Sequence, residues 1–356
     1  MPRIPDYIAD SAIYLYSSDR AAREGENAGG SGFLVNVPAI PGLGHIYAVT
    51  NRHLVDGSTD GQFWTIRLTK RVGGIDCITT NKDEWLLHEE GDDVAILPLG
   101  LKDGLKWWAV PTDKFLDHEG VQANAIGYGD DVFMVGRLIS HSGVQRNTPV
   151  ARFGTIALSA DPAEPIQYRG KKQEAFLVEC HSISGFSGSP VFVMTDRVFR
   201  DEYLQRVLAW ERKKRGTEEP PPNPSGMTIT LTMREGGIGP YLLGIDFGHI
   251  PMRTPVYRKN RKADYKTDYE VQANTGIAGI VPAWKIMDLL VTPRLAEERE
   301  HEDEELKKKL QGLPKTFILD AAKEYQGEEF TQQALEKALR NANRRLDASE
   351  AEAERK

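Results

Sequence analysis

Short apolar runs, broken every few residues by glycine, asparagine, aspartate or proline, dominate the chain from residue 8 to about residue 290. These runs are AIYLY (12–16), GFLVNV (32–37), HIYAVT (45–50), DVAILPL (93–99), VQANAIGYG (121–129), FLVECH (176–181), PVFVM (190–194), YLLGIDFG (241–248) and GIAGIVPA (276–283). They are rich in valine, isoleucine and aromatic residues, which is typical of β-strands. Many short strands with few helical periods predict an all-β barrel or sandwich.

Two segments follow a different pattern. Residues 196–214 space their apolar side chains as one face of a helix, and this predicted helix lies in an insertion, 195–226, that ends in a charged and proline-rich stretch. After residue 284 the composition shifts to Glu, Lys, Ala, Leu and Gln. With a polar seam at 111–120, the chain divides into two β-rich halves, 1–115 and 116–290, and a charged α-helical extension, 291–356.

Composition narrows the class of protein. The chain has 356 residues, of which 40% are hydrophobic and 8% aromatic, as expected for a globular protein with a sizeable core. Its net charge of −7 argues against nucleic acid or an anionic membrane surface as a partner. No apolar run is long enough to predict a membrane span.

The N-terminal stretch and the cysteines indicate the compartment. Asp6 and Asp10 interrupt the only apolar stretch near the start, so we expect no signal peptide. Cys77 and Cys180 are too few for a disulfide framework, and both lie in strand-like contexts where a buried thiol is expected. The sequence therefore predicts a cytoplasmic protein.

One hydroxyl in a serine-rich stretch, SISGFSGSPVF (182–192), is set between glycines. Ser187 has Gly185 two residues before it and Gly188 directly after it. A backbone that must bend sharply around one side chain favours glycine at such positions. The competing serines, which lack this arrangement, are Ser182, Ser184 and Ser189. The alternative interpretation is a flexible, solvated loop.

Two further residues supply what a serine nucleophile requires, namely a base and a carboxylate that orients the base. His53 follows an apolar run in YAVTNRHLVDG, and Asp93 opens another in GDDVAILPL. Asp92 competes with Asp93, which we favour because it directly precedes VAIL. The alternative for Asp93 is a strand cap. No Cys/His cluster has zinc spacing and no phosphate-binding glycine loop occurs, so we expect neither a metal nor a cofactor.

Residues 30–290 resemble the trypsin-like serine proteases, nearest to the bacterial glutamyl endopeptidases and HtrA-like peptidases. The motifs that carry the resemblance are GSGFLV, TNRHLVDG, DDVAILPL, GFSGSPVF, GIDFG and TGIAGIVPA, in this order. The order His, Asp, Ser is that of the chymotrypsin group, and GFSGS lacks the elbow pattern of α/β-hydrolases. The resemblance implies two six-stranded antiparallel β-barrels of the chymotrypsin type, here with an inserted helix and a C-terminal α-helical extension.

The resemblance also assigns roles to residues. It implies that His53 is the general base, that Asp93 orients it and that Ser187 is the nucleophile. The N–H groups of Gly185 and Ser187 then form the oxyanion hole. The resemblance also implies that two groups of residues line the pocket for the side chain before the scissile bond. They are His181 and Ser182, and Asp246, Phe247 and Gly248 of the strand GIDFGH.

Two departures from the family pattern bear on substrate and activation. Asp246 stands where glutamyl endopeptidases carry histidine, so we expect a basic residue before the scissile bond, because a carboxylate attracts Lys or Arg. The alternatives are that Asp246 pairs with His181 or points into the barrel. Phe186 stands where trypsin has the aspartate that pairs with a new N-terminus, so we expect no trypsin-like zymogen switch.

The expected function is that of a cytoplasmic serine endopeptidase that cleaves protein or peptide substrates through an acyl-enzyme. One alternative is a catalytically silent, protease-like peptide-binding module. Another is a partner-gated assembly subunit, in which residues 291–356 bind a regulatory protein or a second copy. The basic segment 253–266 is expected to be a solvated loop rather than a nucleic-acid site.

Overall fold

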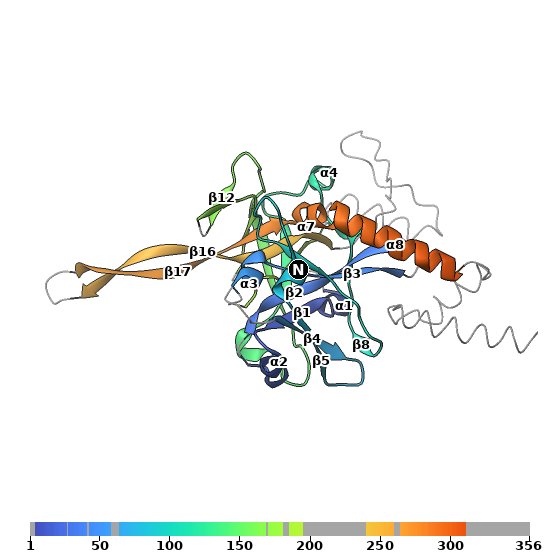
Figure 1. Cartoon of the computed structure of the whole chain (residues 1–356). Helices are drawn as coiled ribbons and strands as arrows, with labels where there is room; N and C mark the ends of the chain where they lie inside the picture. The colour runs from blue at the N-terminus through green and yellow to red at the C-terminus, as the bar shows by residue number, and fades with distance from the viewer. Residues whose placement is uncertain are drawn as a thin grey trace, which may run out of the picture.

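The computed structural model describes residues 4–26, 28–40, 43–57, 64–168, 170–180, 185–194, 240–259 and 264–310. The predicted helix at 196–214, the 195–226 insertion and the chain after residue 310 lie outside the described residues, as do His181 and Ser182. The first half of the chain forms β-strands with short helices between them (Figure 1). Its elements are α1 (Asp6–Ala9), β1 (Ala12–Tyr16), α2 (Asp19–Glu24), β2 (Ala28–Ile40), β3 (Leu43–Thr50), α3 (Arg52–Asp56), β4 (Trp64–Lys70), β5 (Ile75–Thr80), η1 (Lys82–Glu84), β6 (Leu86–Leu87), β7 (Ala95–Pro98), β8 (Leu105–Lys106) and β9 (Val110–Pro111).

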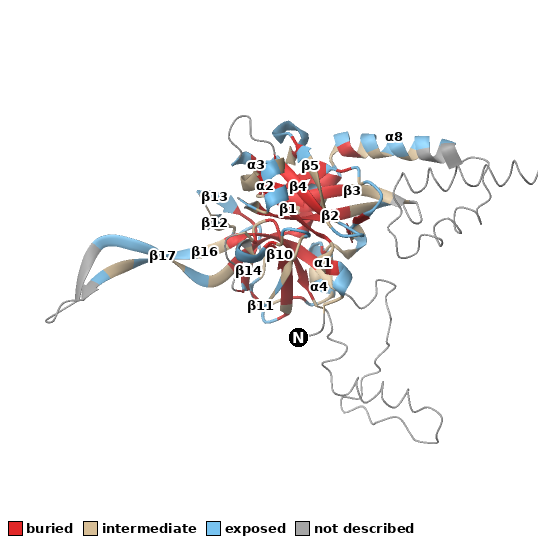
Figure 2. Cartoon of the chain, turned by 90° about the horizontal axis from the view of Figure 1, so that it is seen from below, coloured by how far each residue is buried: buried red, intermediate tan, exposed pale blue. Residues whose placement is uncertain are grey.

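These strands build one curled sheet in the order β5-β4-β1-β2-β3-β7-β6, with β8 added to β4 and β9 to β2. The pairings along the main order are antiparallel, and β9 runs parallel to β2. Every residue of β1, the sequence AIYLY, is buried, because this strand lies between two others with both faces covered (Figure 2). The continuous apolar run in the sequence reflects that central position.

The second half forms a closed barrel in the order β10-β11-β14-β17-β16-β15. Its elements are η2 (Thr112–Lys114), α4 (His118–Ala123), β10 (Asp131–Gly136), η3 (Ile139–His141), β11 (Val150–Leu158), β12 (Ile166–Tyr168), β13 (Lys171–Gln173), β14 (Phe176–Glu179), β15 (Pro190–Val193), β16 (Tyr241–Lys259), β17 (Asp264–Pro282), α7 (Ala283–Leu290) and α8 (Pro293–Leu310). β12 and β13 pair as a separate hairpin. The fold is therefore mostly β with C-terminal helices, consistent with the chymotrypsin fold.

The expectation of two six-stranded barrels holds for the second half only. In the described residues of the first half, the ladder ends at β5 on one side and at β6 on the other, so the sheet is a curled half-barrel. β6 has just two residues, both engaged with β7, which leaves too little strand to continue the ladder. The predicted strand at 121–129 was also wrong: α4 occupies its start, because Asp117 caps the helix by accepting a hydrogen bond from the Gly120 N–H at 2.6 Å.

One hydrophobic core continues across both halves. A single cluster of buried side chains contains Phe33 and Val49 from the first sheet together with Phe133 and Phe192 from the barrel. The rings of Phe133 and Phe192 stack with their centroids 5.2 Å apart. Each fully buried side chain of this size contributes about 1.5–3 kcal/mol through the area removed from water. The shared cluster holds the edges of the two halves together where the candidate site lies.

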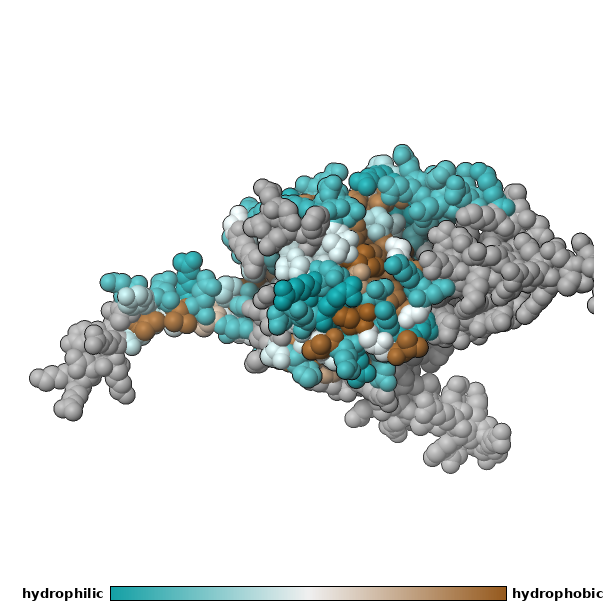
Figure 3. Space-filling view, turned by 60° about the horizontal axis from the view of Figure 1, so that its bottom comes forward, coloured by the Kyte–Doolittle hydropathy of each residue, from teal (hydrophilic) through white to brown (hydrophobic). Residues whose placement is uncertain are grey.

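The hairpin of β16 and β17 extends far beyond the barrel (Figure 1). Residues 253–259 and 264–266 belong to these paired strands, so the predicted solvated loop is largely wrong. Apolar side chains remain exposed along this two-stranded arm, as Figure 3 shows: they are Met252, Tyr257, Tyr269 and Val271. The same β16 strand begins inside the barrel, beside the serine-rich turn.

The described part of the C-terminal extension is helical, as predicted, and it packs on the body. α7, which directly precedes the extension, buries Ile286 and Leu289 in the shared core and Trp284 in a second cluster inside the barrel. α8 lies along β3, where the Arg299 guanidinium donates to the Tyr47 hydroxyl at 3.0 Å. Among the helices that the structure describes, none has both the length and the apolar character needed to cross a membrane.

The two cysteines are free thiols. Cys180 is buried, as expected, whereas Cys77 on β5 is only partly buried because β5 is an edge strand. Burial and, after it, the charge of the nearby Asp246 carboxylate raise the pKa of the Cys180 thiol to about 11. A thiol with such a pKa remains protonated and unreactive near neutral pH.

Candidate active site

His53 lies in the first turn of α3, which directly follows β3 at the boundary between the two halves. The Asp93 carboxylate contacts it twice: one oxygen accepts the His53 backbone N–H at 2.8 Å, and the other lies 2.6 Å from the ring nitrogen Nδ1. The backbone contact also satisfies one of the unpaired N–H groups at the start of the helix. A carboxylate at Nδ1 favours the tautomer protonated there, which leaves Nε2 able to accept a proton.

The main chain of Asp93 is held from two sides. Its N–H donates to the side-chain oxygen of Gln173 at 2.9 Å, and its carbonyl accepts from the Asn51 amide at 2.9 Å. Asp92, the competing carboxylate, lies apart from His53: it accepts a 2.6 Å hydrogen bond from Gln173 and pairs with Lys285 at 3.1 Å. Of the two adjacent aspartates, Asp93 is the one that the structure brings to the imidazole.

Ser187 lies in a tight turn that leads into β15, and the turn is fixed by its backbone. The Ser189 N–H donates to the Phe186 carbonyl at 2.8 Å, while Ser31 of β2 donates its N–H to the Ser187 carbonyl at 2.8 Å. Gly188 donates to the Asp246 carbonyl at 2.8 Å, which joins the turn to β16. The turn is therefore clamped between a strand of the first sheet and a strand of the barrel.

Gly188 shows how closely the two halves approach. Its φ is +90°, and a Cβ atom placed on it would lie 1.8 Å from the Ser31 carbonyl oxygen and 2.8 Å from the Thr50 hydroxyl. Thr50 is three residues before His53. Only glycine allows this contact, because it has no Cβ and adopts a left-handed backbone readily.

A second glycine places the turn beside α3. A Cβ built on Gly30 would lie 2.5 Å from the Leu54 side chain and 3.0 Å from the Ser187 carbonyl oxygen. Leu54 directly follows His53, so the histidine helix and the Ser187 turn flank the same backbone. The Ser187 hydroxyl donates to the Phe247 carbonyl at 3.4 Å, a long hydrogen bond that is readily exchanged.

The described pocket residues lie on β16. The Asp246 side chain is fully buried, and its carboxylate accepts the Gly248 N–H at 2.9 Å. The buried Phe247 ring packs against Tyr168, with centroids 4.6 Å apart. A Cβ on Gly248 would lie 2.9 Å from the Tyr168 hydroxyl and 3.6 Å from the Ser187 Oγ, so Gly248 keeps the space beside that hydroxyl open.

The other residues near Ser187 have specific roles in the turn. The Gly185 carbonyl accepts from the Ser31 hydroxyl at 2.8 Å, and that hydroxyl accepts the Arg137 backbone N–H at 2.9 Å. Ser189, one of the competing serines, has a buried hydroxyl that finds no hydrogen-bond partner among the described residues. Its main chain is what holds the turn.

Sequence reasoning missed several residues of this site. Ser31 lies inside the GSGFLV motif, so the motif indicated that this segment is near the site but did not predict the hydrogen bonds of Ser31. Tyr168, Gln173 and Lys285 lie outside every motif. They reach the site through the hairpin of β12 and β13 and through α7, and no local sequence signal indicates such contacts.

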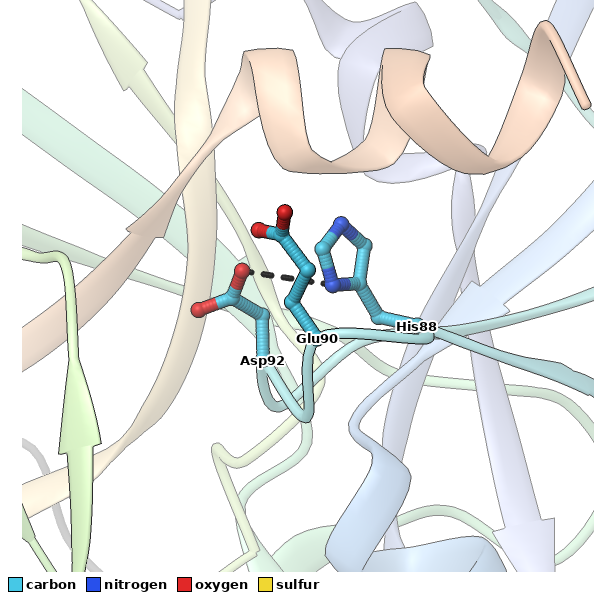
Figure 4. A group of neighbouring side chains, drawn as sticks. All are labelled: His88, Glu90 and Asp92. Carbon is cyan, nitrogen blue, oxygen red and sulfur yellow. Dashed lines mark ion pairs between the residues drawn. The ribbon is translucent and has the colours of Figure 1, made fainter.

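One group of side chains has the donor types of a metal site. His88, Glu90 and Asp92 lie in the loop between β6 and β7, beneath the C-terminal helices, and their ligand atoms are within 4.8 Å of one another (Figure 4). The Lys285 ammonium, however, lies 3.1 Å from Asp92 and 3.5 Å from Glu90. Because a cation already neutralises these carboxylates, we assign no metal to this group.

Comparison with known proteins found a family model and a solved structure that part of the chain resembles. Residues 30–199 match the family model of the trypsin-like peptidase domain. The matched range includes His53, Asp93 and Ser187. Among solved structures, the chain resembles one titled "Crystal structure of Deg5", at 20% identity and a TM-score of 0.36, covering 52% of this chain and 75% of that one. No curated protein matches the chain.

Proposed function

We propose that this protein is a serine endopeptidase of the trypsin-like class. The observation that carries the proposal is the two-point contact of the Asp93 carboxylate with His53, within a trypsin-like peptidase domain whose Ser187 turn lies beside α3. A carboxylate that orients an imidazole able to reach a serine hydroxyl is the arrangement that activates serine for acyl transfer.

The proposed reaction assigns a step to each of these residues. The Ser187 hydroxyl releases the Phe247 carbonyl and attacks the substrate carbonyl carbon, while Nε2 of His53 takes its proton. The resulting oxyanion is stabilised by the N–H groups of Gly185 and Ser187. The C–N bond breaks as His53 returns the proton to the leaving amine. Water, activated by the same imidazole, then hydrolyses the acyl-enzyme and regenerates Ser187.

The side chain preceding the scissile bond is, in this proposal, basic. Asp246 supports this preference, because its carboxylate accepts the N–H of Gly248, the residue at which an added Cβ would lie 3.6 Å from the Ser187 Oγ. The cleavage profile of a peptide library should be dominated by Lys and Arg at that position, and Asp246→Asn should weaken this preference. A profile dominated by acidic or large apolar residues would overturn it.

Activity without N-terminal processing belongs to the same proposal. Phe186 is fully buried, and the Arg152 guanidinium lies 5.3 Å from the centre of its ring. A phenyl ring in this place offers no acceptor for a newly formed ammonium group. We place the enzyme in the cytoplasm, where its two free thiols remain reduced.

Covalent labelling tests the proposal. A fluorophosphonate should modify the native protein at Ser187, and Ser187→Ala should lose both labelling and hydrolysis, with kcat lower by about 10⁶-fold. Ser189→Ala is the matched control. Ser189 lies in the same turn, and among the described residues its hydroxyl has no hydrogen-bond partner. This control should label as the native protein does. Native protein that is folded and resists labelling would favour a peptide-binding module without catalysis.

A further inference from the structure

The loop before β7 turns two adjacent carboxylates in different directions. Asp93 reaches His53, whereas Asp92 is buried and accepts a hydrogen bond from the Gln173 amide at 2.6 Å. On its other oxygen, Asp92 pairs with the Lys285 ammonium of α7 at 3.1 Å. Asp92 is therefore held by groups from β13 and α7, which belong to the other half of the chain, and by His88 of its own loop, whose Nδ1 lies 3.2 Å from the oxygen that faces Lys285.

Gln173 connects the two aspartates. Its side-chain oxygen accepts the Asp93 backbone N–H at 2.9 Å, while its nitrogen donates to Asp92 at 2.6 Å and to the Glu174 carbonyl at 3.0 Å. The side chain is buried. Turning the amide would place its NH₂ group against the Asp93 N–H and its oxygen against a carboxylate, so only one orientation satisfies both neighbours.

Lys285 is the charged end of this arrangement. Its ammonium also lies 3.6 Å from Glu174 and 3.5 Å from Glu90. Burial lowers the pKa of Lys285, but the hydrogen bond to Asp92 and the surrounding carboxylates outweigh this effect, and the net pKa is raised. The lysine therefore stays protonated over the neutral range, and a charge-assisted hydrogen bond of this kind is stronger than one between neutral groups.

We infer that Gln173 and Lys285 are positioning residues for the His53–Asp93 pair. Lys285 fixes Asp92, Asp92 fixes the Gln173 amide, and the amide fixes the main chain of Asp93. The inference rests on the proposed function. It assigns to α7, which follows the last barrel strand, a part in holding the carboxylate that orients the base.

Three substitutions test the sequence of contacts. Gln173→Leu and Lys285→Met should each lower kcat for peptide hydrolysis by about 10–100-fold with little change in KM, because small misplacements of reacting groups have effects of this size. Lys285→Arg should restore most of the rate, since a guanidinium can still pair with Asp92. Lys106→Met is the control: Lys106 forms an exposed ion pair with Asp10 at 2.8 Å, on the first sheet, and its loss should leave kcat unchanged.

A spectroscopic readout separates positioning from general stability. The proton shared by His53 and Asp93 should give a far-downfield NMR resonance in the native protein. We expect Gln173→Leu and Lys285→Met to shift or broaden it in folded samples, while Lys106→Met leaves it in place. If either variant fails to fold, Asp92→Asn keeps the shape of the side chain, removes the ion pair with Lys285 and should still perturb the resonance.

The outcomes distinguish this inference from the proposed function. An active native enzyme whose Gln173→Leu, Lys285→Met and Asp92→Asn variants keep the native kcat and resonance would overturn the positioning role and leave the peptidase proposal intact. A native protein that neither hydrolyses peptides nor reacts with a fluorophosphonate would refute the peptidase proposal. In that case a resonance that still responds to the three substitutions would support the contacts inferred here.

Discussion

The two halves of the candidate active site are held in place by different kinds of contact. On the side of the first sheet, side chains make most of the contacts: Asn51, and Gln173 reaching across from β13, fix the main chain of Asp93, and the Asp93 carboxylate fixes His53. In the barrel, main-chain groups hold the turn that carries Ser187. The positions of His53 and Asp93 are thus open to adjustment by single substitutions, whereas the position of Ser187 depends on backbone geometry that few substitutions leave intact.

Gly188→Ala should have the largest effect, because it acts on the backbone-held half. The new Cβ would meet the Ser31 carbonyl oxygen at 1.8 Å, on a residue with φ of +90°. We expect a loss of more than about 4 kcal/mol in the free energy of unfolding and complete loss of hydrolysis. Urea denaturation measures the first quantity and peptide cleavage the second.

Gly104→Ala provides the control for backbone strain alone. Gly104 has a similar φ of +85°, and a Cβ there would meet nothing within 4 Å. Its substitution should cost about 1 kcal/mol, the penalty for a left-handed residue with a side chain. Equal losses for the two variants would show that the close approach at Gly188 contributes nothing.

Asn51→Ala should have an intermediate effect on the side-chain-held half. The substitution leaves the Asp93 carbonyl without its buried donor, which should lower the free energy of unfolding by about 1–3 kcal/mol. It should also lower kcat by about tenfold or more, because the carboxylate loses one of its anchors. Denaturation curves and steady-state kinetics on the same preparations measure both changes.

The control for Asn51 is Asn147→Ala. Asn147, in the loop before β11, also uses its amide in hydrogen bonds, both of them with Arg67 of β4 at 2.8 Å, and within the described part of the chain it makes no hydrogen bond with His53 or Asp93. This variant should lose similar stability and retain its kcat. If the two variants lose kcat equally, the effect of Asn51 is a general weakening of the sheet.

Asp56→Asn should have the smallest effect, and a pH-dependent one. Asp56 ends α3; its burial raises its pKa, but hydrogen bonds from Arg52 and Lys82 prevail, so the pKa lies below 3.8 in the folded protein. A lowered pKa stabilises the fold above the unfolded value and loses this contribution as pH falls through the folded value. Because the carboxylate is 39% exposed, we expect less than about 1 kcal/mol.

Unfolding measured at two pH values checks this prediction. At about pH 6 the native protein should be slightly more stable than Asp56→Asn, and the difference should shrink as the pH falls below the unfolded value of 3.8 and through the lower folded value. A difference that grows as the solution is acidified would contradict the expected sign.

Local patterns in the sequence predicted much of this molecule. Apolar runs such as AIYLY and PVFV became buried strands, and the segments around His53 and Asp93 brought these residues into contact. What local patterns could not show was whether a sheet closes: that depends on the two-residue length of β6. The strand predicted at 121–129 failed because the capping side chain of Asp117 outweighed the apolar run.

Contacts between distant parts of the chain could not be predicted from local sequence patterns, and the reason is physical. Gln173 is 80 residues from Asp93, and nothing in the KKQEAF context distinguishes it from a surface glutamine. Lys285 likewise resembles any lysine on an amphipathic helix. Their roles arise only when the half-barrel and the barrel meet, so they depend on the packing of whole elements rather than on neighbouring residues.

The missing side chain at Gly188 also bears on how other sequences should be read. A related chain that does not need the Ser187 hydroxyl, which makes one long hydrogen bond, could replace this serine, yet it would have to keep Gly188 in order to fold. In such chains the glycine indicates that the fold is kept, and the serine indicates that the chemistry is kept. A search that identifies enzymes by the Ser-Gly motif could therefore count chains that match through the glycine alone and have lost the serine.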